Sequence, residues 1–308
     1  MTEMPAPSAV PPVSFRLYHD DFEAFAQALG GSFARYGFAV IRDHGLDQVR
    51  IDAAVTDAKR FFALPEAAKL RYRVPGAAGQ VGYTPFGVET AKDAEHFDLK
   101  EFWHVGRGTD GLENVWPAEL ATFKDNEQWL YDALEDLGDK VLRAVARYLG
   151  LDPGYFAGAT HDGTSVLRLL HYPPAPFEGP NLRAAAHEDI NTITLLLGAE
   201  EGGLEIKDRD GTWLPVNPPP GSVVCNIGDM LQRLTNHVLP STTHRVANPP
   251  PERRGVARYS TPFFLHFAPD FLIRTLPSCV SPERADRYPT PITAHDYLQE
   301  RLREIKLG

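Results

Sequence analysis

The stretch HEDINTITLLL, residues 187–197, decides the fold, because a polar turn leads directly into a short block of β-forming residues. Similar short apolar or alternating segments follow one another from Leu151 onward, separated by Gly, Pro and Asn. Their spacing, with no helix-length segment between most of them, is typical of an antiparallel sandwich or barrel. We therefore expect strands near residues 165–172, 192–197, 203–206, 213–216, 222–226, 244–247 and 258–267.

The amino-terminal half instead has the three- and four-residue apolar spacing of amphipathic helices. Gly37 suits a left-handed helix stop after the first of these stripes. Residues 74–111 are rich in Gly and aromatic residues and show no clear helical period. The expected elements are helices over 21–36, 47–62 and 117–149, a short strand at 38–41, a turn of helix after Pro65, and a final helix from Ala294.

Composition limits the class of protein. The 308 residues carry 31 basic and 41 acidic side chains, a net charge of -10 that disfavours a nucleic-acid partner. Two cysteines cannot form a disulfide scaffold or a thiolate zinc cluster. No apolar run approaches the ~20 residues that span a bilayer, and the amino terminus lacks the pattern of a signal peptide. We expect a soluble, cytoplasmic protein that is a monomer or a weak homo-oligomer.

The chain is expected to form one structural unit with three regions. Residues 1–14, rich in Pro and Ala, are predicted to be a flexible arm. Residues 15–150 are predicted to be a helical cap region, and residues 151–308 a β core with a carboxyl-terminal helix.

Three residues in the core predict a metal site. His187 and Asp189 are two positions apart, so on a strand both would point to one face. An isolated His-x-Asp pair is weak evidence, and the same pattern occurs at His96 and Asp98 in the Gly-rich stretch. His244, flanked by β-formers, supplies a third ligand. Two imidazoles and a carboxylate suit non-haem Fe(II), although zinc would accept the same ligands.

Arg258 and Ser260 predict a carboxylate-binding site. They too are two positions apart on an expected strand, where a guanidinium beside a hydroxyl could hold a carboxylate by two bonds. The alternative is a structural ion pair. Because the strand that Arg258 heads is very apolar, its charge would be heavily desolvated without a partner, which favours a bound dicarboxylate.

These motifs resemble the iron(II)- and 2-oxoglutarate-dependent oxygenases, in the isopenicillin N synthase-like branch. The resemblance covers most of the chain and implies a mainly β fold, a double-stranded β-helix or jelly roll preceded by amino-terminal helices. The matching segments are YGFAVIRDHG (36–45), FFALPEAAK (61–69), GYTPFGVETAKDAEHFDLKEFWHVG (82–106), LRLLHYPP (167–174), HEDINTITLLL (187–197), GGLEI (202–206), WLPVNPPPGSVVCNIGDMLQRLTNHVLPSTTHRV (213–246) and RYSTPFFLHF (258–267).

The resemblance also implies a chemistry. Fe(II) would be held by His187, Asp189 and His244. The cosubstrate 2-oxoglutarate would chelate the metal, with its distal carboxylate on residues that match Arg258, Ser260 and Tyr172. Oxidative decarboxylation of 2-oxoglutarate by O₂ would be coupled to oxidation, usually hydroxylation, of a small molecule. Plant members often have Asn where this chain has Leu170, so one polar contact to the cosubstrate is missing here.

The residues that contact the substrate are less clear from the sequence. Candidates are Phe86 and His104, in the aromatic stretch, and Arg168 and His171, polar residues on an expected core strand. Loop packing and surface exposure are equally open for them. His96 and Asp98 are expected to order the loop.

Three alternative functions stay open at this stage. The nearest is an oxidase of the same fold that does not consume 2-oxoglutarate, similar to isopenicillin N synthase. A jelly roll that binds a small acid without turnover has no chemical reason to retain the complete triad. A hydrolytic zinc enzyme has no need of the Arg258–Ser260 pair.

Overall fold

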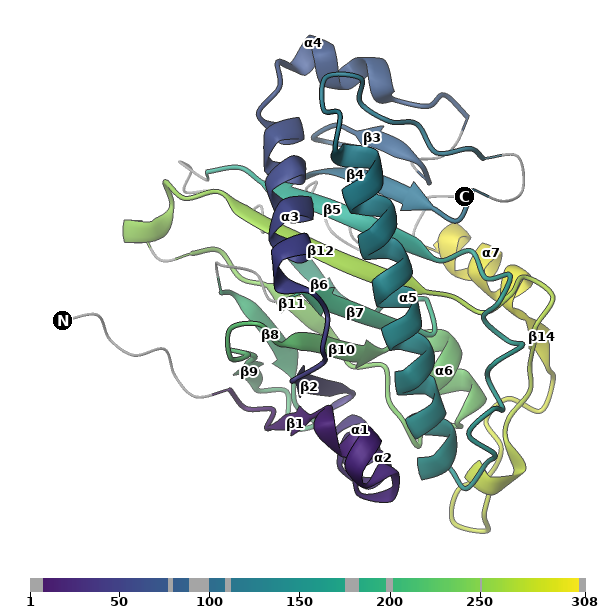
Figure 1. Ribbon diagram of the computed structural model, residues 1–308. Helices are drawn as coiled ribbons and strands as arrows, with labels where there is room; N and C mark the ends of the chain where they lie inside the picture. The colour runs from purple at the N-terminus through teal and green to yellow at the C-terminus, as the bar shows by residue number, and fades with distance from the viewer. Residues whose placement is uncertain are drawn as a thin grey trace.

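The core of the protein consists of two β-sheets (Figure 1). The computed structural model describes residues 8–76, 80–88, 100–108, 112–174, 183–197, 202–249 and 251–304. The larger sheet has eight strands, in the order β1 (Pro12–Ser14), β2 (Phe38–Arg42), β10 (Val223–Ile227), β7 (Ile193–Leu197), β12 (Arg258–Leu265), β5 (Val166–Tyr172), β4 (Glu101–Gly106) and β3 (Gly82–Thr84). The smaller sheet has the order β6 (Ala184–His187), β11 (His244–Val246), β8 (Leu204–Lys207) and β9 (Trp213–Pro215). A two-stranded ribbon of β13 (Leu272–Ile273) and β14 (Ile292–Thr293) lies apart from both.

The two faces of the larger sheet have different partners. On the inner face, Phe38, Val40 and Val224 form an apolar cluster with Leu204 and Ile206 of the smaller sheet. The outer face packs on helices α2 (Phe22–Tyr36), α3 (Gln48–Phe62) and α5 (Phe123–Tyr148), and Figure 1 shows α3 and α5 crossing it. The jelly-roll core that the resemblance implies is therefore confirmed, with helices on one side of it. The other helices are α1 (Arg16–Asp20), α4 (Glu66–Lys69), α6 (Asp229–Leu234) and α7 (Ala294–Glu304).

Local signals in the sequence account for most helix ends. The Asp47 side chain accepts hydrogen bonds from the N–H groups of Val49 and Arg50, so α3 begins there. Gly37 has φ +69° and ends α2, as its left-handed preference predicts. The third long helix begins at Phe123 and not at Pro117, because residues 117–122 form turns before it.

All of the strands expected in the carboxyl-terminal half are present, and six further strands were not predicted, namely β1, β3, β4, β6, β13 and β14. The strand β6 is an Ala-Ala-Ala-His segment with no β-forming run, and β3 and β4 lie in the aromatic stretch between residues 74 and 111. The strands β3 and β4 pair with each other, and β4 pairs with β5 of the core. Residues 15–150 thus supply strands as well as helices, because this segment extends the larger sheet.

The predicted flexible arm needs a correction at its carboxyl-terminal end. Residues 12–14 form β1, which pairs in parallel with β2 so that Pro12 lies opposite Val40. Val13 is buried in the core. Ladder hydrogen bonds and this apolar contact order a segment whose composition alone favours a loose chain.

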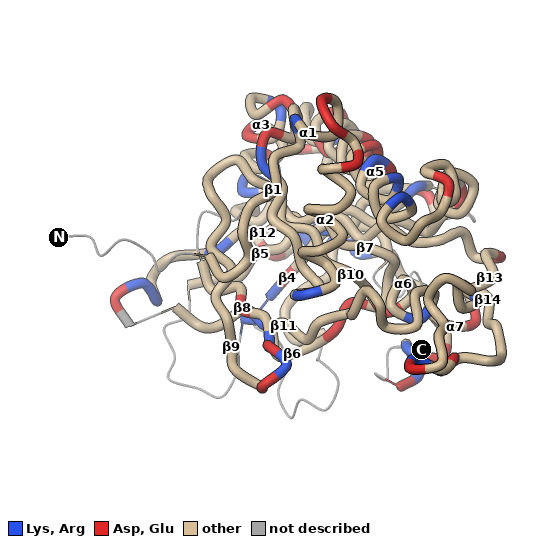
Figure 2. Tube along the Cα trace, turned by 90° about the horizontal axis from the view of Figure 1, so that it is seen from below, with Lys and Arg blue, Asp and Glu red and all other residues tan. Residues whose placement is uncertain are grey.

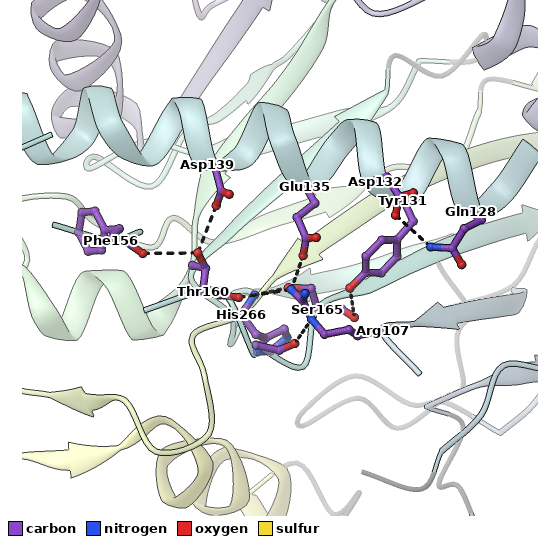
Figure 3. A network of polar contacts seen from close by, with 11 residues as sticks. Arg107, Gln128, Tyr131, Asp132, Glu135, Asp139, Phe156, Thr160, Ser165 and His266 are labelled. Carbon is purple, nitrogen blue, oxygen red and sulfur yellow. Dashed lines mark hydrogen bonds and ion pairs between the residues drawn. The ribbon is translucent and has the colours of Figure 1, made fainter. Parts of the chain in front are cut away.

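Polar contacts tie α5 to the ends of the core strands (Figure 3). Arg107, just after β4, forms an ion pair with Glu135 of α5 and donates to the carbonyl of Gly163 at 2.8 Å. The Tyr131 hydroxyl of α5 donates to the carbonyl of Ser165, at 3.2 Å. These contacts hold the helix in register with β5.

Charged residues lie mostly on the helices and the loops, whereas the strands of the larger sheet consist mostly of uncharged residues (Figure 2). No helix in the described part of the chain has both the length and the apolar composition to cross a membrane.

Candidate metal centre

Two histidines and one aspartate meet where the smaller sheet begins. His187 ends β6 and lies opposite His244, the first residue of β11, with 4.3 Å between the ring centroids. Asp189 follows two residues after His187, and its Oδ1 lies 3.7 Å from Nε2 of His187 and 3.8 Å from Nε2 of His244. The ligand atoms of the three residues lie within 4.8 Å of one another. The sequence-predicted triad is thus brought together.

Both imidazoles are oriented by backbone carbonyls. Nδ1 of His187 lies 2.7 Å from the carbonyl oxygen of Ala185, and Nδ1 of His244 lies 3.1 Å from that of Thr242. Because a carbonyl oxygen only accepts, each Nδ1 carries the proton and each Nε2 presents a lone pair. This arrangement, in which a second hydrogen bond sets the tautomer, is common around bound metals.

The aspartate is oriented by two side chains of the larger sheet. Oδ2 of Asp189 accepts from the Thr194 hydroxyl at 2.6 Å and from the Asn226 amide at 2.8 Å. Thr194 and Asn226 lie opposite each other on β7 and β10. The second oxygen, Oδ1, is therefore the one that faces both imidazoles.

The charge state of the cluster suits a cation. Burial would raise the pKa of Asp189, but His244, His187 and the two hydrogen bonds outweigh it and hold that pKa below its usual range. Burial, together with the neighbouring His244, lowers the pKa of His187 to about 4. At neutral pH the ionised carboxylate of Asp189 thus lies beside a neutral His187, and the 3.7 Å between Oδ1 and Nε2 is too long for a direct hydrogen bond. A divalent metal ion fits this donor set.

The predicted carboxylate site lies on the inner face of the same sheet. Tyr259, Phe263 and Leu265 of β12 pack in the outer cluster, so alternation turns Arg258 and Ser260 inward. Both are buried, with 2% and 6% of their surface exposed.

The tyrosine of the predicted set lies beside this pair. Tyr172 of β5 lies directly opposite Arg258, whose guanidinium carbon is 5.2 Å from the tyrosine ring centroid. Leu170 lies opposite Ser260 and forms a small apolar cluster with Tyr172 and Phe102. The buried guanidinium of Arg258 therefore lies beside an apolar cluster.

The four substrate candidates separate into two places. His104 and Arg168 lie opposite each other on β4 and β5, and Nε of Arg168 donates to Nε2 of His104. His171 instead lies on the outer face, stacked on Tyr259 with 4.8 Å between ring centroids, and its Nδ1 is 2.7 Å from Oε1 of Glu101.

Strand alternation explains this separation. Arg168 and His171 are three positions apart, so they point to opposite faces and only Arg168 shares the inner face. The sequence reading that either could meet the substrate therefore needs a correction at His171. Phe86 is 41% exposed, and its ring lies 6.3 Å from that of His171.

The remaining histidines and acidic residues that the sequence brought into question do not belong to the metal cluster in the described structure. His96 and Asp98 lie outside the described residues. His237 has φ +62° in a turn, and its Nε2 lies 2.6 Å from the Tyr288 hydroxyl, which is a structural role. Thr194 and Asn226 were missed, although a lone Asn inside the apolar run VVCNI was a usable signal.

Comparison with known proteins agrees with this geometry. The chain matches the family model described as 2OG-Fe(II) oxygenase superfamily over residues 163–267, and the model described as non-haem dioxygenase in morphine synthesis N-terminal over residues 10–119. The 2-oxoglutarate-Fe(II) type oxidoreductase hxnY of Emericella nidulans is 33% identical, over 96% of this chain and 89% of that protein. A solved 2OG-Fe(II) oxygenase family protein from Caulobacter crescentus is 63% identical with a TM-score of 0.90, over 97% of this chain and 100% of that chain. A full-length Neurospora crassa protein, crystallised in complex with alpha-KG, is 30% identical with a TM-score of 0.87, over 96% and 95%.

Proposed function

Because the chain belongs to the iron(II)- and 2-oxoglutarate-dependent oxygenases, we propose that its iron is held by His187, Asp189 and His244. The observation that carries this assignment is the convergence of two Nε2 lone pairs and one carboxylate oxygen within 4.8 Å. Two imidazoles and one carboxylate bind an octahedral ion on one side only, which leaves coordination positions open for small ligands.

We further propose that Arg258, Ser260 and Tyr172 bind the distal carboxylate of 2-oxoglutarate. A buried guanidinium with a hydroxyl on the same face of β12 can hold a carboxylate by charge-assisted bonds. The Arg258 charge has lost most of its water, so an anion on it is bound more strongly than at the surface. The apolar residues Leu170 and Phe102 exclude water from the methylene part of the molecule.

The reaction is the oxidation of a small molecule coupled to conversion of 2-oxoglutarate and O₂ to succinate and CO₂, and the bound iron supplies its redox chemistry. The protein orients the side chains that hold the metal. Thr194 and Asn226 hold one oxygen of Asp189 so that the other faces the ion. The Ala185 and Thr242 carbonyls keep both imidazoles in the tautomer that can ligate.

The proposal also covers the outcome of the reaction, the oligomeric state and the location of the protein. We propose hydroxylation as the outcome for the small-molecule substrate, a monomeric or weakly associating protein, and a cytoplasmic location. The charge of -10 supports a substrate other than nucleic acid, because it offers polyanions no long-range attraction. Residues 15–150 would act as a cap around the core, in one structural unit with it.

The test is turnover with balanced products. Protein purified without oxygen should bind about one Fe(II), and O₂ uptake should require 2-oxoglutarate and yield one succinate per 2-oxoglutarate consumed. O₂ uptake that proceeds without 2-oxoglutarate would support the oxidase alternative instead. Relatives named 2-oxoglutarate-dependent dioxygenases, such as htyE of Aspergillus rugulosus at 34% identity, do not favour that alternative.

A further inference from the structure

A buried ionic cluster lies on the outer face of the larger sheet, where the helices pack. Glu101, the first residue of β4, is 1% exposed. Its Oε2 accepts from Nζ of Lys69 at 2.7 Å and from the hydroxyl of Tyr83. Its Oε1 lies 2.7 Å from Nδ1 of His171. Lys69 and Tyr83 are also buried, so the cluster joins α4, β3, β4 and β5 away from water.

The carboxylate at the centre of this cluster is ionised. Burial would raise the pKa of Glu101, but the hydrogen bonds from His171, Lys69 and Tyr83 outweigh it and hold that pKa below its usual range. Because a carboxylate only accepts, Nδ1 of His171 carries a proton and donates it to this bond. Hydrogen bonds to a charged acceptor are shorter and stronger than neutral ones, so Glu101 holds the imidazole firmly in one orientation.

Two aromatic rings stack on the same imidazole. The ring centroid of His171 lies 5.4 Å from that of Phe62, the last residue of α3, and 4.8 Å from that of Tyr259 on β12. Nζ of Lys69 also donates to the carbonyl of Phe62, at 3.3 Å. The imidazole is therefore fixed by one charge-assisted bond and two ring contacts, and it links β4 to β12 across β5.

The cluster lies directly behind the proposed cosubstrate anchor. His171 lies opposite Tyr259, and the next step of the same ladder places Tyr172 opposite Arg258. Strand alternation turns the first pair to the outer face and the second pair to the inner face. The Arg258–Tyr172 pair is the last step of this ladder in the described part of the chain. Contacts of the preceding step on the outer face therefore control how these two residues are opposed.

Building on the proposed function, we propose that Glu101 and His171 are positioning residues for 2-oxoglutarate. By holding His171 against Tyr259, the Glu101 carboxylate fixes the last steps of the ladder. It thereby sets the direction in which Arg258 and Tyr172 meet the distal carboxylate. A two-pronged arginine contact depends on the plane of the guanidinium, so a small rotation of the strand end breaks one of its bonds. The metal ligands lie in the smaller sheet and in the loop after β6, outside this effect.

The experiment compares two ligands of equal chain length on protein loaded with Fe(II) under nitrogen. 2-Oxoglutarate carries the distal carboxylate, and 2-oxopentanoate has a methyl group in its place. Dissociation constants for both are measured by titration, and their ratio is the preference for the distal carboxylate. The ratio isolates the anchor, because both ligands present the same keto acid to the metal.

Three variants separate positioning from stability. His171→Phe keeps an aromatic ring for the stack and removes the bond to Glu101. Glu101→Gln keeps the shape of the side chain and an accepting oxygen and removes the charge. Arg107→Met is the matched control, because it breaks a partly buried ion pair with Glu135 just past the other end of β4. Thermal unfolding and iron content are measured for each variant.

The wild type should prefer 2-oxoglutarate by about 10- to 100-fold, as a charge-assisted contact predicts. His171→Phe should lower this preference about tenfold, the factor for one lost charge-assisted bond, and bind 2-oxopentanoate as the wild type does. Glu101→Gln should lower it by a smaller factor, because a neutral bond replaces a charged one. Arg107→Met should unfold at a lower temperature and keep the wild-type preference. In all three, iron content and the rate of succinate formation at saturating 2-oxoglutarate should stay near the wild-type values.

A preference that is unchanged in both His171→Phe and Glu101→Gln would leave the cluster a structural role and overturn the proposal. An equal loss of affinity for the two ligands, or an equal fall of the preference in Arg107→Met, would do the same, because either indicates a general distortion. If one of the cluster variants does not fold, the other carries the test. Failure of the proposed function is separate, because it shows as a wild type that binds the two ligands equally well.

Discussion

Replacing Arg258 by Gln should raise the 2-oxoglutarate concentration for half-maximal turnover by about 10- to 100-fold. Arg258 is 2% exposed and lies beside Ser260 on the inner face of the larger sheet, so its contact with a carboxylate is shielded from water. A hydrogen bond to a charged group contributes about 1.5–3 kcal/mol, and each 1.4 kcal/mol corresponds to a factor of ten. A two-pronged contact lies at the upper end of this range.

Two further variants test the geometry of this contact. Arg258→Lys keeps the charge and loses the planar fork, so it should recover part of the affinity. Ser260→Ala removes one hydrogen bond from an uncharged donor to the carboxylate, about 1.5 kcal/mol at the lower end of that range, so half-saturation should rise only about tenfold. The anchor assignment requires this order of effects, with Gln worse than Lys and Lys worse than the Ser change.

The assay is a titration of 2-oxoglutarate with succinate as the product measured, alongside iron content and thermal unfolding. Iron content should stay near the wild-type value, since the Arg258 side chain is not among the metal ligands. If Arg258→Gln unfolds at a lower temperature but has an unchanged half-saturation, the arginine is structural. That result would refute the cosubstrate assignment and favour the oxidase alternative.

Four other outcomes follow from the site and the core. His244→Ala should lose its iron while keeping its fold, and iron content near wild type by metal analysis would remove His244 from the ligand set. Asn226→Ala takes one of two hydrogen bonds from Asp189, so iron should bind about 10- to 100-fold more weakly in a chelator competition, and unchanged affinity would contradict this. Burial lowers the pKa of His187 to about 4, so the free energy of unfolding of the metal-free protein should decrease as the pH falls from 6.5 towards 4. In a His187→Gln variant, denaturant unfolding should show a smaller decrease over the same pH range. Glu127 is fully buried, and its carboxylate oxygens have no hydrogen-bond partner in the described structure. Burial raises its pKa well above 4.5. Its contribution to the stability of the folded state is therefore greatest below pH 4.5 and is lost as the pH rises. Glu127→Gln should therefore remove a loss of up to about 1.4 kcal/mol per pH unit above 4.5, measured by denaturant unfolding between pH 5 and 8, and parallel curves for the two proteins would count against it.

The sequence by itself determined the features that depend on neighbours along the chain. Apolar spacing placed α2 and α3 within about a residue of their ends, because helix contacts recur every three or four positions. The alternation of short β-forming runs was enough to predict every strand from Val166 to Leu265 except β6, whose Ala-Ala-Ala-His sequence has no such run. The His-x-Asp pair at 187 and 189 was visible for the same reason, since two ligands two positions apart need no knowledge of the fold.

Tertiary structure alone decided which residues far apart in the chain meet. The hydrogen bonds of Thr194 and Asn226 to Asp189 depend on how β7 and β10 pair. The outward direction of His171 and the contact between Arg168 and His104 depend on the register between β4 and β5. A shift of one residue in that register would turn these side chains to the opposite face, and nothing local in either strand specifies it. Strand pairing is selected by the burial of whole faces, which is a property of the complete fold.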